Sequence, residues 1–395
     1  MASPKSIIRQ SVISLVNSLG TSSELIGTPG GLIDTEDWCR NNGATYRVVW
    51  PGHQLTNKPP VVLEECCHQL YKNELEVQYP DSFLAVINNG RVWGRNGAVI
   101  TPDDLLLNDV SREFGKYGGV FGREHSVFRQ IKLSRARYID GTVAVIASPG
   151  AYNFHHWLYD NIARFGILEQ CGFLKQADYF VLDYMGIPFQ TEALKCLNIP
   201  EEKILNCHDN WHFHIKARKL IVPSLPSRLG VVTPWVVAYL KKLFAPDIKP
   251  EKGNRRIYIS RKKADTRRLK NEDDLLDFLQ KYGFEPYFAE DHSIAETAQV
   301  FSESSFVVGV HGSGLSNLAF SPEGVKVIDI IEPKHLDPYY WIITNIKKGD
   351  YAYFVSEGDF DLNKTELVEN KVNNDLVIDL DRFKRLFSNI LATEH

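Results

Sequence analysis

The segment from Phe306 to Asn317 could bind an anion, because an apolar strand runs directly into a turn of small residues and then into a helix. Glycines in such a turn let the backbone approach a ligand closely, and the start of the helix offers unpaired N–H groups at the positive end of its dipole. His311, at the end of the strand, could donate a hydrogen bond to a phosphate. The alternative is an ordinary tight turn in which His311 caps the backbone.

A second candidate for anion binding is the segment between Ser260 and Glu272, which is rich in lysine and arginine. A strand ends there and an acidic helix start follows. The planar guanidinium of arginine can donate two parallel hydrogen bonds to two oxygens of one phosphate. In a chain whose net charge is −4, this local basic cluster favours diphosphate binding. The alternative is a solvated surface loop.

A third candidate lies in the helix expected from Asn153 to Cys171, which carries His156, Asp160 and Arg164 at intervals of four residues. Residues four apart share one face of a helix. A carboxylate beside an imidazole can act as a general base, and a guanidinium can bind a polar acceptor. The alternative is a buried structural salt bridge.

Two further segments offer weaker signals. The histidines between Cys207 and His214 alternate as on a strand, but no CxxC pair accompanies them, so we predict no metal ligand there. Glu332 follows a predicted strand that ends at Ile331, and it could accept hydrogen bonds from ribose hydroxyls. Its alternative is a carboxylate that faces water.

The elements that must position these residues differ between the two halves of the chain. In the first half, residues 82–109 indicate an antiparallel meander, and residues 136–148, 179–182 and 220–222 indicate further strands. Beyond residue 254, strands and helices alternate, which is typical of a parallel, doubly wound sheet. The strands are expected at 256–260, 285–288, 306–310 and 325–331, and the helices at 272–282, 294–303, 315–320 and 339–346.

A length of 395 residues exceeds what one core usually organises, so two domains are expected. The proline, glycine and charge content of residues 245–254 indicates a linker, and we predict domains at 1–233 and 234–378. Residues 379–395 form an amphipathic pattern that is predicted to pack back on the first domain as a helix. The fold class is α/β.

The overall composition excludes several classes of protein. A net charge of −4 gives no general attraction to nucleic acid or to anionic membranes. The chain has no run of about 18 apolar residues, and its N-terminus has the spacing of an amphipathic helix rather than that of a signal peptide. The six cysteines lack CxxC spacing, so we expect reduced thiols and a cytoplasmic location. Any membrane attachment would be peripheral, at the inner face.

Together these segments resemble glycosyltransferase family 61, over about residues 80–335. The resemblance rests on GRVWGRNGAVITPDDLLLNDVS, FHHWLYDNIARF, ISRKKADTRRLKNE and VGVHGSGLSNLAFSPEGVKVIDIIEP. The chain departs from the family in having Ala163 where proline is frequent and a second histidine, His155, before the usual one.

The resemblance implies a GT-B-like fold, in which two Rossmann-like domains face each other across a cleft. It implies inverting, metal-independent transfer from a nucleotide-sugar, with UDP as the first choice of nucleotide. The acceptor would be a glycan or a lipid-linked glycan, with no cofactor and no nucleic acid. Donor binding is expected in the second domain, at Arg261, Arg268, Asn271, His311, Gly312, Ser313, Gly314, Leu315, Asn317 and Glu332.

With the diphosphate assigned to the second domain, the catalytic base should come from the first. Asp160 is predicted to be this base and His156 to position the acceptor hydroxyl, with His156 as the rival base. His155, Trp157 and Arg164 are predicted to bind the acceptor. The alternative functions are a catalytically silent, transferase-like module that binds nucleotide or glycan, and, less well supported, an epimerase acting on a nucleotide-sugar.

Overall fold

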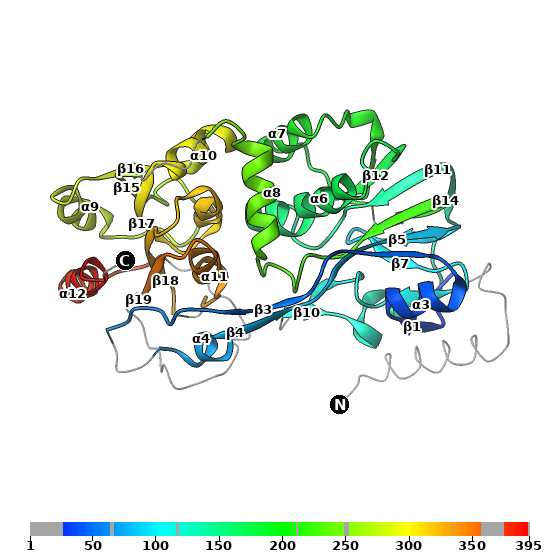
Figure 1. Ribbon diagram of the computed structural model, residues 1–395, viewed down its shortest axis with the longest axis horizontal. Coiled ribbons are helices and arrows are strands. Elements are labelled where there is room, and N and C mark those ends of the chain that lie inside the picture. Colours follow the sequence, from blue (N-terminus) through cyan, green and yellow to red (C-terminus); the bar gives the residue numbers. More distant parts are fainter. Residues whose placement is uncertain are drawn as a thin grey trace.

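The structure is a computed structural model, and it describes residues 27–63, 67–115, 118–210, 212–248, 253–333, 335–356 and 375–393. It has a mixed α/β architecture with two main sheets (Figure 1). The first sheet draws its strands from residues 31–223 and the second from residues 255–355, with α8 (Pro234–Phe244) between them in the chain. The helix expected at the N-terminus lies outside the described residues.

The first sheet has ten strands, of which four form a parallel group. The members of this group, in order across the sheet, are β14 (His214–Pro223), β11 (Arg137–Val145), β12 (Tyr179–Leu182) and β13 (Ile204–Asn206). The rest is mainly antiparallel, so this sheet departs from a purely parallel Rossmann sheet. Its strands are β2 (Thr45–Trp50), β5 (Ser82–Asn88), β6 (Arg91–Trp93), β7 (Ala98–Ile100) and β8 (Leu105–Leu107), with β1 (Gly31–Ile33) parallel to β8.

The second sheet has five strands, all parallel, as the alternating pattern predicts. Their order is β16 (Phe284–Tyr287), β15 (Arg255–Ile259), β17 (Ser304–Val310), β18 (Lys326–Ile331) and β19 (Asp350–Val355). The edge strand β19 is absent from the sequence prediction.

Helices cover both faces of the second sheet. One face packs against α10 (Ile294–Ser302), the 3₁₀ helix η6 (Ser313–Phe320) and α11 (Tyr339–Ile346). The other face packs against α9 (Glu272–Gln280) and α12 (Leu380–Leu391). In the first half, α5 (Phe154–His156), α6 (Ala163–Gln170) and α7 (Pro188–Cys196) lie on one side of the sheet and α3 (Thr35–Asn42) on the other.

One apolar core runs through both halves of the molecule. It joins Phe165 of α6 and Leu240 of α8 to Val307 of the second sheet and Leu318 of η6. Because burial of apolar surface is the main force that holds such elements together, the two sheets are fixed to each other by packing as well as by the chain.

The small C-terminal helix α12 packs on the second sheet, so the prediction that it returns to the first domain is wrong. Its apolar face, with Phe383, Leu386, Phe387 and Ile390, is buried against α9 and the second sheet. The rings of Phe387 and Phe306 stack 5.5 Å apart. Figure 1 shows α12 at the end of the molecule, beyond β18 and β19. Amphipathicity indicated a packing face but could not identify its partner.

An arm from the first half of the chain lies against the second sheet, so the predicted boundary does not divide the contacts cleanly. We define this arm as residues 57–63 and 67–73, between β3 (His53–Thr56) and β4 (Glu76–Tyr79), and it includes α4 (Gln69–Asn73). The N–H of Val61 donates to the carbonyl of Tyr351, and the indole of Trp341 donates to the carbonyl of Lys58. The ring of Tyr71 stacks 4.8 Å from that of Tyr353.

Two absences apply to the described part of the chain. None of its helices is long and apolar enough to cross a bilayer. Its cysteines, which are Cys39, Cys67, Cys171, Cys196 and Cys207, form no disulfide.

Candidate active site

A histidine and an aspartate form a hydrogen-bonded pair where α5 ends. The side chain of Asn153 accepts a hydrogen bond from the N–H of His155 and so caps this helix. The helix then passes through a π-helical turn, Trp157–Ile162, before it continues as α6. π-Helical turns are rare in proteins overall, but those that occur are often found at functional sites. His156 and Asp160 lie on this stretch, with 2.7 Å between Nδ1 and Oδ2.

The partners of Asp160 define the orientation of His156. Asp160 is buried, and its two oxygens accept the N–H of Gly230 at 3.0 and 3.1 Å. Because a carboxylate accepts only, Nδ1 of His156 is the donor, which leaves the lone pair on Nε2. Within the described residues Nε2 has no hydrogen-bond partner, and the side chain is 15% exposed. Of the pair, His156 therefore has the accessible basic atom.

His155 does not have the position expected for an acceptor-binding residue. It is buried, and both ring nitrogens are bonded within the protein: Nε2 to the carbonyl of Gly230 at 2.8 Å and Nδ1 to Oγ of Ser316 at 2.9 Å. Since the carbonyl accepts, Nε2 carries the proton and Nδ1 accepts from the hydroxyl. Burial lowers the pKa of His155 to about 3, so the ring is neutral. His155 therefore has no free ring nitrogen to offer to an acceptor.

Trp157 and Arg164 are also buried, which removes them from contact with an acceptor. The guanidinium of Arg164 donates to the carbonyls of Pro223 and Ala147, and burial lowers its pKa to about 9. It therefore joins α6 to the ends of two strands instead of binding substrate. The spacing of four residues allowed either an acceptor-binding face or a buried polar cluster, and Arg164 has the buried position.

On the second sheet, two arginines lie beside the turn that follows β17. Nη2 of Arg261 donates to the carbonyl of Thr266 at 2.9 Å, and Nη1 of Arg267 donates to the carbonyl of His311 at 2.8 Å. Neither guanidinium forms an ion pair with a carboxylate of the described residues. Burial, and then the charge of Arg267, lower the pKa of Arg261 to about 10. Two partly buried cations without an anion are the arrangement expected of an anion site.

The glycine turn is shaped to fit one of these arginines. A Cβ at Gly312 would lie 2.2 Å from Nη1 of Arg261, and a Cβ at Gly314 would lie 3.0 Å from Ile259. Only glycine at position 312 lets the guanidinium lie against the turn. Nε of Arg267 is buried and has no partner within the described residues, so this side chain retains an unused donor.

Arg268 and Asn271, both predicted to bind the donor, have other partners. Arg268 pairs with Asp375 at 2.9 Å on the surface, and Asn271 exchanges two hydrogen bonds with the backbone of Ile378. Both residues thus hold the segment that leads into α12. Arg267, which the sequence prediction omitted, lies at the turn in their place.

His311 belongs to a second histidine–aspartate pair. Its Nδ1 lies 2.8 Å from Oδ2 of Asp329, which also accepts from the hydroxyl of Tyr351. His311, His335 and Asp337 each bring one candidate ligand atom to within 4.8 Å of the others. Two imidazoles and a carboxylate could ligate a divalent cation. The segment from Cys207 to His214 does not gather such a set, because His208 binds Asp183 whereas His214 contacts Ser134 and Arg91.

The remaining predicted donor residues lie around η6 and the end of β18. Leu315 is a core residue, and the amide of Asn317 donates to the carbonyl of Gly314, which shapes the turn from inside. Ser313 and Gly314 are partly exposed at the start of η6, and Glu332 is buried after β18. Ser313 and Gly314 are therefore the members of this set with accessible backbone.

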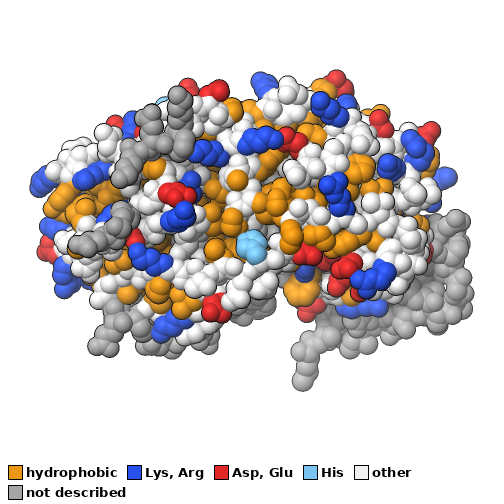
Figure 2. All heavy atoms as spheres, in the orientation of Figure 1, with side chains coloured by type: hydrophobic (Ala, Val, Ile, Leu, Met, Phe, Trp, Pro, Cys, Tyr) orange, Lys and Arg blue, Asp and Glu red, His pale blue; other side chains and the backbone are white. Residues whose placement is uncertain are grey.

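Charge on the face of the molecule drawn in Figure 2 is dispersed. Figure 2 shows lysine and arginine side chains interspersed with acidic ones across one face, without a patch of a single sign. A cavity of about 660 Å³ lies between α6, α7 and α8, but none of the predicted site residues lines it. The local chemistry at Arg261, Arg267 and His156, and not this cavity, defines the candidate site.

Comparison with known families agrees with this location. Residues 154–328 match the family model described as Glycosyltransferase 61, and they contain the His156–Asp160 pair, both arginines and the glycine turn. Over this region the chain is similar to glycosyltransferase family 61. The match supports a glycosyltransferase activity, with a sugar donor and an acceptor. No curated protein matches the chain.

Proposed function

We propose that this protein transfers a sugar from a nucleotide-sugar, with UDP as the first choice, to a hydroxyl of a glycan or lipid-linked glycan. The observation that carries the donor assignment is the pair Arg261 and Arg267, two partly buried guanidiniums without a carboxylate partner in the described residues. A diphosphate supplies the two negative groups that this pair lacks.

These residues also have a role in the reaction that we propose. Negative charge grows on the diphosphate as the glycosidic bond breaks, and donors fixed in place stabilise that charge. Arg261, Arg267 and His311 lie at the carboxyl ends of β15 and β17, the edge where parallel sheets bind their ligands. In a GT-B-like arrangement the acceptor would approach from the first domain.

We assign the catalytic base to His156 and the supporting role to Asp160, the reverse of the sequence prediction. In this scheme Nε2 takes the proton of the acceptor hydroxyl while the hydroxyl oxygen attacks the anomeric carbon, which gives inversion. Asp160 holds the tautomer and stabilises the imidazolium that forms. The carboxylate oxygens of Asp160 already accept hydrogen bonds from His156 and from the N–H of Gly230.

We propose that the transfer needs no divalent metal, because the two arginines can balance the diphosphate charge. The rival arrangement is a cation at His311, His335 and Asp337. Transfer measured in excess chelator, with and without added Mn²⁺, separates the two. Loss of activity with chelator and its return with Mn²⁺ would overturn metal independence.

The overall proposal is tested by release of nucleoside diphosphate from a panel of UDP- and GDP-sugars, with and without acceptor glycans. A glycosyltransferase releases the nucleotide faster when the right acceptor is present. Binding of UDP without release from any donor would instead favour a silent binding module. We also propose a cytoplasmic location, and the buried thiols of Cys39 and Cys207, which form no disulfide among the described residues, support it.

A further inference from the structure

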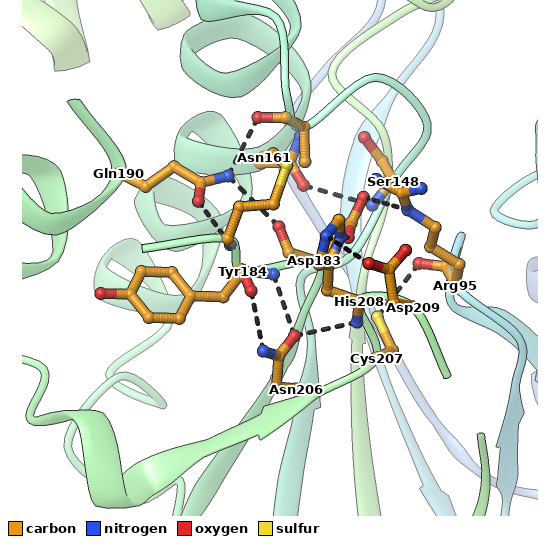
Figure 3. A network of polar contacts seen from close by, with 12 residues as sticks. Arg95, Ser148, Asn161, Asp183, Tyr184, Gln190, Asn206, Cys207, His208 and Asp209 are labelled. Atoms are coloured by element: carbon orange, nitrogen blue, oxygen red, sulfur yellow. Dashed lines mark hydrogen bonds and ion pairs between the residues drawn. The ribbon is translucent and has the colours of Figure 1, made fainter. Parts of the chain in front are cut away.

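A polar network lies at the carboxyl edge of the first sheet, outside the residues assigned so far (Figure 3). Its centre is Asp183, which directly follows β12 and is buried. Oδ2 of Asp183 accepts from Nε of Arg95 and Oδ1 accepts from Nδ1 of His208, each at 2.7 Å. Nε2 of His208 lies 3.2 Å from a carboxylate oxygen of Asp209. One buried carboxylate thus orients two side chains from two other segments.

The outer atoms of this network remain available to a ligand. Within the described residues the Arg95 side chain bonds through Nε alone, and it is 40% exposed, so its two terminal nitrogens are unused. The Asp209 side chain is 78% exposed. Asp209 also has φ of 47°, in the left-handed region that non-glycine residues seldom adopt. The carboxyl edge of the first sheet therefore presents the terminal N–H groups of Arg95 as hydrogen-bond donors and the exposed carboxylate of Asp209 as an acceptor.

The network lies close to the proposed base. A Cβ at Gly97, in the turn that carries Arg95, would lie 2.9 Å from the carbonyl of Ala147. A Cβ at Gly150 would lie 2.9 Å from the ring of His156. Ala147 and Gly150 are three positions apart in the chain, a span of at most about 11 Å. Asn161 joins the two ends, since it accepts from the N–H of Ser148 and donates to the carbonyl of His156.

We infer that Arg95 and Asp209, oriented through Asp183 and His208, bind a neutral, hydroxyl-bearing sugar unit of the acceptor, next to the unit that reacts at His156. This inference rests on the proposed function, because it extends the acceptor side of that reaction. A sugar hydroxyl both donates and accepts, so neighbouring hydroxyls satisfy a guanidinium and a carboxylate together.

The charges favour a neutral sugar over an acidic one. Asp183 offsets Arg95, and Asp209 adds a second negative charge at the exposed side of the network. A uronate or a phosphate would meet that carboxylate. The location also suits a substrate subsite, because ligands of parallel sheets bind beyond the carboxyl ends of strands.

The experiment uses two variants that keep the buried carboxylate partnered. Arg95→Lys retains the positive charge but loses the paired N–H donors of the guanidinium. Asp209→Asn removes an exposed negative charge, and asparagine tolerates the positive φ of this position. The matched control is Arg218→Lys, which alters an exposed arginine–aspartate pair with Asp140 elsewhere in the same sheet. Each protein is tested, with UDP present, on an array of neutral, uronate-bearing and phosphate-bearing oligosaccharides.

Wild-type protein and Arg218→Lys should bind neutral oligosaccharides, and the two network variants should bind them about tenfold more weakly. UDP affinity and donor hydrolysis should stay unchanged in all variants. Equal glycan binding in all four proteins, no glycan binding by the wild type, or preference for acidic glycans overturns the inference. Failure of wild-type protein to bind either UDP or GDP instead overturns the proposed function, so the two failures are distinguishable.

Discussion

The ring of His155 lies against Ser316, with 2.9 Å between Nδ1 and Oγ, although the residues are 161 positions apart. The hydroxyl of Tyr159 donates to the backbone carbonyl of the same serine at 2.7 Å. Through its other nitrogen, His155 holds the carbonyl of Gly230, whose N–H binds Asp160. The proposed base pair and the donor-side helix η6 are thus joined by a short series of hydrogen bonds.

The first prediction concerns stability in acid. His155 has a pKa of about 3 in the folded protein, below its ordinary value of about 6.5. Below pH 6.5 His155 therefore binds a proton in the unfolded chain, whereas in the folded protein it stays neutral until the pH nears 3. The stability due to the neutral ring is complete above pH 6.5 and is lost as the pH falls towards 3, with a slope that approaches about 1.4 kcal/mol per pH unit.

The measurement is urea unfolding of wild type and His155→Gln at several values between pH 7.5 and 4.5. The difference between their free energies of unfolding should shrink as the pH falls, because glutamine does not titrate. His292→Gln, at an exposed histidine, is the control and should track the wild type. Parallel curves for wild type and His155→Gln would show that His155 is not held neutral.

The second prediction separates His156 from Asp160. His156→Gln should lower the rate of transfer by about 10²-fold or more, because the base is lost. Asp160→Asn should also lower it, because an amide no longer fixes the tautomer, but the pH dependence due to the imidazole should persist. Initial rates across pH 5 to 9 test this, with melting temperatures as a check on folding. Near-normal transfer by His156→Gln would return the base to Asp160.

The third prediction separates two adjacent arginines. Arg267→Gln should weaken UDP binding about tenfold or more, since a charge-assisted bond to the diphosphate is lost. Arg268→Gln should change it less than about twofold, because Arg268 pairs with Asp375 on the surface. Isothermal titration with UDP provides both values. The assignment fails if Arg268→Gln is the more damaging change.

The fourth prediction concerns α12. Phe383→Ala should destabilise the protein by about 3–5 kcal/mol, because Phe383 is fully buried between α12 and the second sheet. Lys384→Ala, at the neighbouring and partly exposed position, should change stability by less than about 1 kcal/mol. Chemical unfolding measures both. Similar small losses would mean that α12 does not belong to the core of the second half.

The parts of the fold that follow from local pattern could be predicted from the sequence. Strands and helices alternate along the chain from the strand that begins at Arg255 to the strand that ends at Val310. This alternating order is typical of a parallel sheet. The pairing of His156 with Asp160 also follows from spacing, and it survives the π-helical turn.

The features that depend on distant contacts could not be predicted. Arg267 has φ of 57°, a conformation that its own sequence does not signal, and its guanidinium, not that of Arg268, bonds the carbonyl of His311. The burial of His155 depends on Ser316, and the buried network around Asp183 depends on Arg95, 88 positions away. Neither partner is visible in a local pattern.

The arm in the first half of the chain has a consequence for synthesis on the ribosome. The carbonyl of Lys58 cannot accept its hydrogen bond until Trp341 is synthesised, 283 residues later. In the same way, the ring of Tyr71 cannot stack until Tyr353 is synthesised. At about 5–20 residues per second, that interval is on the order of tens of seconds. During this time the nascent first half carries an uncovered apolar segment, so chaperone binding to the growing chain should centre on the arm until β19 emerges.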